Sequence, residues 1–288
     1  MQIAICKKRM LKKILILGAS GFIGNSIQKE LSKYYNTFGT YHTNKLFKIK
    51  NNFQYYDIAS SDINKLIIRV KPNLIISCLK GSFSLQIKTH ESVIEYVKKN
   101  NCRIMFISSS NVFDAFEHFP SYEYDKTLSK SRYGKLKSNI ENLILKLNPA
   151  KYVIIRLPMV FGIKSHRNKE IKLLIKENKP IDVYPNTIVN INSDSILSQQ
   201  VNYIINKNLS GIFHLGTKDL ISHFDLIKKI VRKVDNNNLK FKHIYTTNNL
   251  RYIAVLPKKN CLPSHLYPNC ESIINSFSLN LNIFKKNG

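Results

Sequence analysis

The amino-acid sequence predicts an α/β protein with a doubly wound parallel sheet and a smaller C-terminal α/β lobe. Two observations predict this fold class. Short apolar runs alternate with segments of helical spacing through the first half, and a glycine-rich turn joins the first run to the first such segment. The chain has 288 residues, of which 43% are hydrophobic, so its length and composition allow a sizeable core.

The strands of the sheet are expected where short apolar runs are bounded by turn residues. They are predicted at Lys13–Leu17, Asn36–Tyr41, Phe53–Asp57, Asn73–Cys78, Arg103–Ser108 and Tyr152–Arg156. The intervening helices are predicted at Phe22–Tyr34, Asp62–Val70, Glu91–Asn100 and Leu128–Leu147. Strands separated by helices of this length form parallel βαβ units with right-handed crossovers. After Gly162 the pattern weakens, although helical spacing returns at Lys169–Glu177, Ser193–Ile205 and His223–Val234, and Gly211–Leu215 resembles a strand.

The chain is strongly basic, with 45 Lys and Arg against 18 Asp and Glu and a formal charge of +27. Such a charge can serve a nucleic-acid partner, but the basic residues are spread along the whole chain and form no long arm. We interpret most of the charge as a solvated surface, with part of it available to attract an anionic small molecule such as a nucleotide diphosphate. No specific nucleic-acid partner is expected.

The five cysteines are odd in number and include no C-x-x-C pair, which argues against a disulfide framework or a zinc site, and no metal is expected. This cysteine usage fits a reducing cytoplasm. No apolar run approaches the roughly 18 residues that a membrane span needs.

The turn G-A-S-G-F-I-G follows the first predicted strand and opens the first helix. Its three glycines suit a tight turn, a close approach of pyrophosphate to the backbone, and close packing of helix on strand, while the helix N-terminus attracts phosphate. This placement predicts a dinucleotide site and a Rossmann-type domain. The cofactor-binding residues expected in the turn are Gly18, Ser20, Gly21, Phe22, Ile23 and Gly24.

His42 directly follows the second predicted strand. An acid at this place in a dinucleotide-binding fold binds the adenosine ribose hydroxyls and repels a 2′-phosphate. Because no acid is present, the sequence favours NADP over NAD. Asp57 ends the third strand and can either meet the adenine or cap the following segment. Cys78, at the end of the fourth strand, is expected near the cofactor as a small packing residue.

Tyr133 and Lys137 lie four residues apart in a predicted helix and so project from one face. A nearby cation favours the phenolate and lowers the pKa of a tyrosine, and such a tyrosine can give a proton to a carbonyl oxygen as hydride reaches the carbon. The alternative is a surface helix in a lysine-rich chain. Ser108, Ser109 and Ser110 follow an apolar strand, where a hydroxyl can orient the same carbonyl.

These motifs occur in an order that resembles the extended short-chain dehydrogenase/reductases of the NAD-dependent epimerase/dehydratase superfamily. Within that group, S-S-N-V-F-D at 109–114, Y-G-K-L-K-S-N-I-E at 133–141 and G-I-F-H-L-G at 211–216 resemble the dTDP-4-dehydrorhamnose reductases. The resemblance implies Ser109 as the catalytic hydroxyl, Tyr133 as the acid and Lys137 as its support and a cofactor ligand. It implies cytoplasmic nucleotide-sugar chemistry, with a homodimer as an open possibility.

The sequence also departs from that family. Ser110 stands where that family has an acid after the catalytic hydroxyl. The absence of this acid argues against dehydration, and we expect Ser110 to contact the substrate. The family's Asn on the helix before the fifth strand has no counterpart between Gln86 and Glu91, and its late Arg-Pro is Leu256-Pro257. Arg156 either reaches a substrate phosphate or forms an ion pair at its strand end.

We therefore expect residues 10–162 to form an NAD(P)-binding Rossmann domain. Residues 163–288 are expected to form mainly a substrate-binding lobe, with some segments returning to the sheet. Residues 1–9 can be an N-terminal extension, since Met10 offers a second start. The expected function is reduction of a nucleotide-linked 4-keto sugar. The alternatives are a sugar-nucleotide epimerase on the same scaffold, or a non-catalytic cofactor-binding subunit that regulates a partner enzyme.

Overall fold

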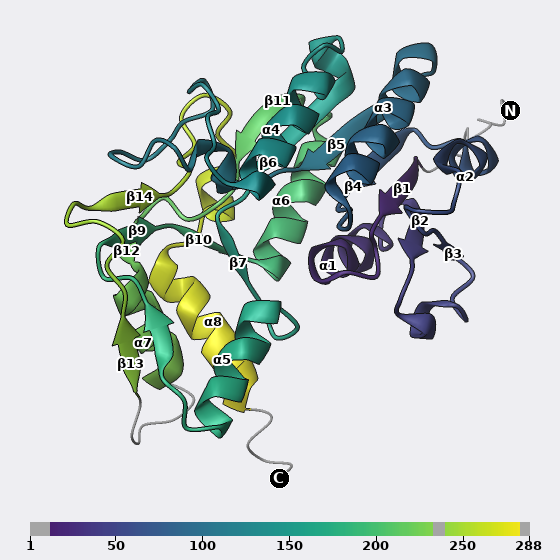
Figure 1. Cartoon of the computed structure of the whole chain (residues 1–288). Helices are drawn as coiled ribbons and strands as arrows, with labels where there is room; N and C mark the ends of the chain where they lie inside the picture. The colour runs from purple at the N-terminus through teal and green to yellow at the C-terminus, as the bar shows by residue number, and fades with distance from the viewer. Residues whose placement is uncertain (1–11, 233–239, 283–288) are drawn as a thin grey trace, which may run out of the picture.

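The protein is built around a seven-stranded sheet in which every neighbouring pair of strands is parallel (Figure 1). The computed structural model describes residues 12–232 and 240–282. The strand order is β11-β6-β5-β4-β1-β2-β3. These strands are β1 (Lys13–Leu17), β2 (Asn36–Tyr41), β3 (Phe53–Tyr55), β4 (Leu74–Ser77), β5 (Arg103–Ile107), β6 (Tyr152–Arg156) and β11 (Gly211–His214). The predicted doubly wound α/β fold is confirmed, and the order reverses between β1 and β4, where such folds bind ligands.

Helices cover both faces of this sheet. They are α1 (Phe22–Leu31), α2 (Ile63–Val70), α3 (Phe83–Lys99), α4 (Arg132–Ile144) and α6 (Asp194–Asn206). Alternate residues of β1 enter separate cores, because successive side chains of a strand point to opposite faces. Ile14 and Ile16 pack with residues of α1 and α6, whereas Leu15 and Leu17 pack with residues of α2, α3 and α4. All four side chains are fully buried.

A smaller lobe lies beyond the carboxyl ends of the strands (Figure 1). Its elements are β7 (Met159–Phe161), α5 (His166–Lys176), β8 (Ile181–Val183), β9 (Thr187–Val189), β10 (Ile191–Ser193), β12 (Ile221–Ser222), α7 (His223–Arg232), β13 (Phe241–His243), β14 (Arg251–Ile253) and α8 (Cys270–Asn282). The strands pair in sheets of two or three and pack against α5, α7 and α8 through separate apolar clusters.

The chain returns from this lobe to the sheet between residues 194 and 214. There α6 packs on α1, and β11 pairs with β6 at the sheet edge. Two hydroxyl contacts join the helices, from Ser26 to the carbonyl of Asp194 and from Ser198 to Ser26. The extension considered at residues 1–9 lies outside the described residues.

The largest differences between predicted and observed helix starts concern α3 and α4. Helix α3 begins at Phe83, two turns before the predicted Glu91, because its first turns mix polar residues with Phe83 and Leu85 and lack a clear apolar period. Helix α4 begins at Arg132, since the Ser131 hydroxyl accepts a hydrogen bond from the Gly134 amide and caps the helix there.

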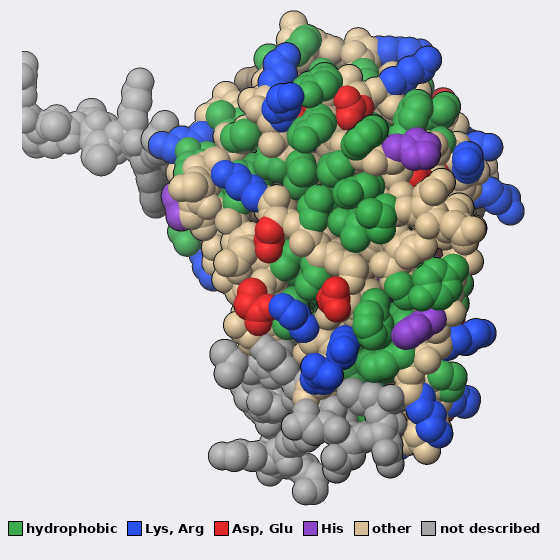
Figure 2. Space-filling view, turned by 90° about the vertical axis from the view of Figure 1, so that its left-hand side faces the viewer, with side chains coloured by type: hydrophobic (Ala, Val, Ile, Leu, Met, Phe, Trp, Pro, Cys, Tyr) green, Lys and Arg blue, Asp and Glu red, His purple; other side chains and the backbone are tan. Residues whose placement is uncertain are grey.

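The basic side chains are dispersed over the surface, and the described cysteines are unpaired. On the face in Figure 2, Lys and Arg side chains are scattered among apolar and neutral ones and form no continuous basic patch. Cys78, Cys102, Cys261 and Cys270 are free thiols. In the part of the chain that the structure describes, no helix is long and apolar enough to cross a membrane, and no cluster of His, Cys, Asp or Glu could hold a metal ion.

Candidate active site

A cavity of 880 Å³ lies between the carboxyl ends of the central strands and the smaller lobe. The sheet side contributes the glycine-rich turn, the ends of β2, β4 and β5, and the start of α4, while the lobe contributes residues of α5, β9, α7 and β14. Four cationic side chains line the cavity, from Lys80, Lys137, Arg167 and Arg251. Among the described residues, no Asp or Glu lines it. The cavity therefore suits anionic ligands.

The glycine-rich turn has the geometry of a phosphate cradle. Gly18 has a φ of +77°, and a Cβ there would lie 2.7 Å from the carbonyl oxygen of Cys78. A Cβ on Gly24 would lie 2.3 Å from the carbonyl oxygen of Gly18, so only glycine lets α1 start this close to the turn. The first backbone N–H groups of a helix have no partner within it, and here Phe22, Ile23 and Gly24 supply them beside the cavity.

The turn is held by Thr40, which the sequence reasoning missed. The Gly18 amide donates a 2.8 Å hydrogen bond to the Thr40 hydroxyl, and the Ser20 amide donates to the Thr40 carbonyl at 3.1 Å. Thr40 is buried at the end of β2 and also lines the cavity. A threonine in the second strand has no distinctive sequence signal, because its role depends on the pairing of β1 with β2.

Three further cofactor residues were predicted after the second, third and fourth strands. Of these, His42 and Cys78 line the cavity. The third, Asp57, does not line it. Its carboxylate accepts hydrogen bonds from the Ala59 amide and the Ser60 hydroxyl, which hold the pKa of that carboxyl below its usual value. Asp57 thus caps its own turn, with one oxygen 3.8 Å from Nε2 of His42. The geometry favours the capping interpretation over adenine contact.

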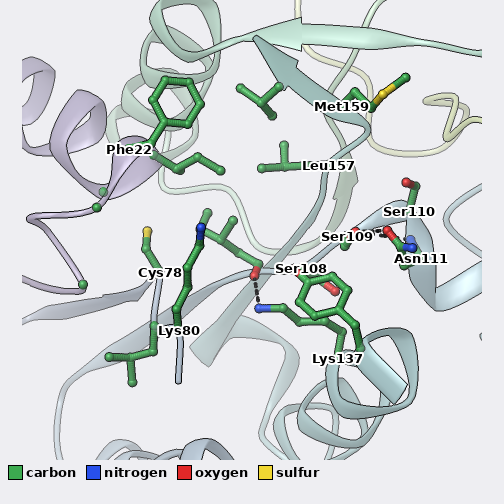
Figure 3. A pocket seen from close by; sticks show the side chains of 18 of the residues that line it. Phe22, Cys78, Lys80, Ser108, Ser109, Ser110, Asn111, Lys137, Leu157 and Met159 are labelled. Atoms are coloured by element: carbon green, nitrogen blue, oxygen red, sulfur yellow. Dashed lines mark hydrogen bonds between the residues drawn. The ribbon is translucent and has the colours of Figure 1, made fainter. Parts of the chain in front are cut away.

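The predicted catalytic residues come together on one wall of the cavity. Nζ of Lys137 lies 5.6 Å from the centroid of the Tyr133 ring and donates a 3.0 Å hydrogen bond to the Ile107 carbonyl at the end of β5 (Figure 3). The Ser109 hydroxyl lies close enough to the Tyr133 phenol to act on its pKa, and it donates a 2.9 Å hydrogen bond to Oδ1 of Asn111. Phenol, hydroxyl and ammonium therefore lie near one another on this wall.

Burial sets the acidities of this group. Partial burial raises the pKa of Tyr133, which is 44% exposed, and the nearby Ser109 hydroxyl opposes the rise only in part. The pKa of Tyr133 therefore lies above its usual value, and the expectation that Lys137 lowers it is not met. Burial also lowers the pKa of Lys137 to about 8, and the ammonium of Lys80 acts in the same direction. At neutral pH Tyr133 is a protonated acid.

Buried hydrogen bonds and an ion pair link α4 to the ends of the neighbouring strands. The Ser108 hydroxyl donates to the carboxylate of Glu141, which lies one helical turn after Lys137 and forms an ion pair of 2.8 Å with Arg156. Arg156 is 2% exposed and does not line the cavity. Of the two roles considered for Arg156, the geometry favours the ion pair over contact with a substrate phosphate. Ser110 does line the cavity, and its amide donates to the Leu157 carbonyl at 2.8 Å.

A buried histidine, His90, contacts the residue before Cys78. Nδ1 of His90 faces the Gln86 carbonyl at 2.6 Å, and Nε2 faces the Ser77 hydroxyl at 2.8 Å. A carbonyl can only accept, so Nδ1 carries the proton and Nε2 accepts from Ser77. Gln86 is buried, lines the cavity and donates to the Gly81 carbonyl at 2.9 Å, on the helix where the family's Asn had no counterpart.

The lobe side of the cavity was not predicted from the sequence. Arg167 projects from α5, Arg251 from β14 and His223 from α7. The guanidinium of Arg251 pairs with Glu117, while the Tyr184 amide lies 3.3 Å from Nδ1 of His223. Burial and the charge of Arg167 lower the pKa of His223 to about 4, so this imidazole is neutral. In a basic chain, single arginines carry no local signal of a site.

The fold and the cavity define a Rossmann-like α/β protein in which a phenol, a hydroxyl and an ammonium lie on one wall beside the glycine-rich turn. Residues 12–262 match the model of the RmlD substrate binding domain family, and the chain belongs to this family. The family-level resemblance inferred from the motifs is confirmed.

Known proteins agree with this assignment. A dTDP-4-dehydrorhamnose reductase from Aggregatibacter actinomycetemcomitans is 24% identical over 283 residues, covering 87% of this chain and 90% of that protein. The structure of dTDP-4-dehydrorhamnose reductase from Bacillus anthracis in complex with NADP has a TM-score of 0.75 at 20% identity, covering 94% of this chain and 100% of that one. WbmH from Bordetella bronchiseptica in complex with NAD⁺ has a TM-score of 0.73 at 18% identity, covering 86% and 89%.

Proposed function

We propose that this protein is an NAD(P)H-dependent reductase of a nucleotide-linked 4-keto sugar, similar in its chemistry to the dTDP-4-dehydrorhamnose reductases. The observation that carries the proposal is the proximity of Ser109, Tyr133 and Lys137 on one wall of a cavity that the glycine-rich turn also lines. A Cβ at Gly18 or Gly24 would collide with backbone atoms, so these two glycines permit the tight strand-to-helix turn on which a dinucleotide site depends.

In this reaction the bound nicotinamide supplies a hydride to the carbonyl carbon. Tyr133 gives its phenolic proton to the carbonyl oxygen, and the Ser109 hydroxyl hydrogen-bonds the same oxygen and orients it. Lys137 stabilises the phenolate that forms, and its position on α4 also allows it to bind the nicotinamide ribose. A proton from solvent then restores Tyr133.

The lobe side supports a substrate that carries a diphosphate. Arg167 and Arg251 supply two guanidinium groups across the cavity from Tyr133, and guanidinium pairs well with phosphate oxygens. No carboxylate lining the cavity opposes a double negative charge. A free keto sugar would offer no anion to Arg167, nor to Arg251, which is otherwise paired with Glu117.

We propose NADP as the preferred cofactor. His42 lies where an acid would otherwise bind the ribose hydroxyls, and Asp57, the nearest carboxylate, is held by its own turn. An imidazole can accept a 2′-phosphate that a carboxylate would repel.

The test is oxidation of NADPH and of NADH with a panel of dTDP- and UDP-linked 4-keto sugars, followed at 340 nm. We expect turnover with at least one sugar and a higher kcat/KM for NADPH. A cofactor that stays bound through purification, together with interconversion of sugars without net oxidation, would identify an epimerase instead. Cofactor binding without turnover across the panel would indicate the regulatory role.

A further inference from the structure

Lys80 is a second ammonium in the cavity, and neither the sequence motifs nor the catalytic group accounts for it. It follows β4 by three residues and lines the cavity, into which Figure 3 shows its side chain pointing. It forms no hydrogen bond or ion pair with any residue that the structure describes. A cation directed into a cavity without an acidic partner is placed for an anionic ligand.

The backbone around Lys80 contacts the glycine-rich turn directly. A Cβ on Gly18 would lie 2.7 Å from the carbonyl oxygen of Cys78 and 3.4 Å from the amide nitrogen of Leu79, the residue before Lys80. Strand β4 pairs with β1, and the Cys78 amide donates a 2.9 Å hydrogen bond to the Leu17 carbonyl. Lys80 therefore emerges beside the turn that would hold a pyrophosphate.

On its other side, Lys80 lies within electrostatic range of the catalytic wall. Its ammonium is one of the charges that lower the pKa of Lys137. Arg167 and Arg251, by contrast, belong to the lobe on the far side of the cavity. Lys80 is thus placed between the phosphate cradle and Lys137, away from the proposed diphosphate site of the substrate.

We propose that Lys80 is a cofactor-binding residue whose ammonium pairs with the pyrophosphate of the bound dinucleotide. This inference rests on the proposed function, since it requires a dinucleotide in the glycine cradle. Bound pyrophosphate also screens Lys80 from Lys137, so the cofactor itself relieves the repulsion between the two ammonium groups.

The test compares Lys80→Gln with Lys88→Gln, which removes the same charge from an exposed position on α3. Dissociation constants for NADPH, for ADP-ribose and for dTDP are measured by isothermal titration calorimetry. ADP-ribose retains the pyrophosphate and lacks nicotinamide. We expect Lys80→Gln to weaken NADPH and ADP-ribose by about tenfold and to leave dTDP unchanged. Lys88→Gln should leave all three unchanged, and Lys80→Arg should retain most of the affinity.

Unchanged affinity of Lys80→Gln for ADP-ribose would overturn the inference, as would an equal loss in Lys88→Gln. A loss confined to dTDP would overturn it by placing Lys80 in the substrate site. Each of these results leaves the proposed reductase intact. Failure of the wild-type protein to bind NADPH, NADH and ADP-ribose would overturn the proposed function together with the inference. Matching thermal unfolding midpoints check that the variants fold alike.

Discussion

The carboxylate of Glu141 and the guanidinium of Arg156 form an ion pair of 2.8 Å, with side chains 1% and 3% exposed. Glu141 belongs to α4, which also carries Tyr133 and Lys137, and it accepts the Ser108 hydroxyl at the end of β5. Nη1 of Arg156 donates to the Glu123 carbonyl at 3.2 Å. Glu141 therefore joins α4 to the end of β6 through Arg156 and to the end of β5 through Ser108.

Loss of the Glu141 charge should destabilise the fold. Glu141→Gln leaves the buried Arg156 without a counter-ion, and we expect the free energy of unfolding to fall by about 3–5 kcal/mol. Urea denaturation measures the change. The additional substitution Arg156→Met should recover part of the loss, and Glu95→Gln, which breaks an exposed pair with Lys98, should have no measurable effect. A fully stable Glu141→Gln variant would contradict the role of the pair.

Removal of the Tyr133 hydroxyl should abolish turnover and preserve cofactor binding. Tyr133→Phe loses the proton donor, and we expect kcat to fall by about 10²–10⁴-fold. Steady-state kinetics with the accepted 4-keto sugar and titration of NADPH measure the two properties separately. Tyr34→Phe, at an exposed tyrosine outside the cavity, serves as the control. Retained turnover in Tyr133→Phe would show that another group gives the proton.

The kcat/KM for reduction should decline as the pH rises through about 8. Burial lowers the pKa of Lys137 to about 8, so the ammonium loses its proton as the pH rises through about 8 in the free enzyme. We expect kcat/KM for reduction to fall over that range. Because the ammonium of Lys80 contributes to the lowering, Lys80→Gln should move this limb to higher pH. Measurements from pH 6 to pH 10 would contradict the assignment if the profile stayed flat.

Stability should decline on the acid side because three histidines are buried as neutral imidazoles. Burial lowers the pKa of His90 and of His223 to about 4 and that of His214 to about 3. Between pH 6.5, near the usual pKa of histidine, and pH 4, the unfolded chain takes up protons that the folded chain does not. The free energy of unfolding should therefore fall as the pH falls through this range.

The variant His90→Gln tests whether the buried histidines cause the loss of stability at acid pH. It removes one of the three groups, so the decline in unfolding free energy between pH 7.5 and pH 4.5 should be smaller than in the wild type. His118→Gln changes an exposed histidine and should leave the decline unaltered. Equal slopes for the wild type and His90→Gln would assign the acid sensitivity to other groups.

The structure bears out the predictions that depend on local patterns. Strands β1, β2 and β6 have the predicted bounds, because short apolar runs between turn residues identify buried parallel strands. Helix α3 was predicted too short, since its first two turns depend on packing over the cavity and carry no apolar period. The lobe strands β7, β8, β9, β10, β12, β13 and β14 were not predicted, because runs of two or three residues carry little periodic signal.

By itself, the sequence determined the doubly wound sheet, the glycine cradle and the pairing of Tyr133 with Lys137. The sheet follows from the alternation of apolar runs and helical segments along the chain, and the other two follow from spacing within one turn or one helix. Only the tertiary structure decided that Arg156 pairs with Glu141 and that Arg167, Arg251 and Lys80 face one cavity. It also decided that burial raises the pKa of Tyr133. Burial and contacts between distant segments depend on how the layers pack, and no local pattern encodes them.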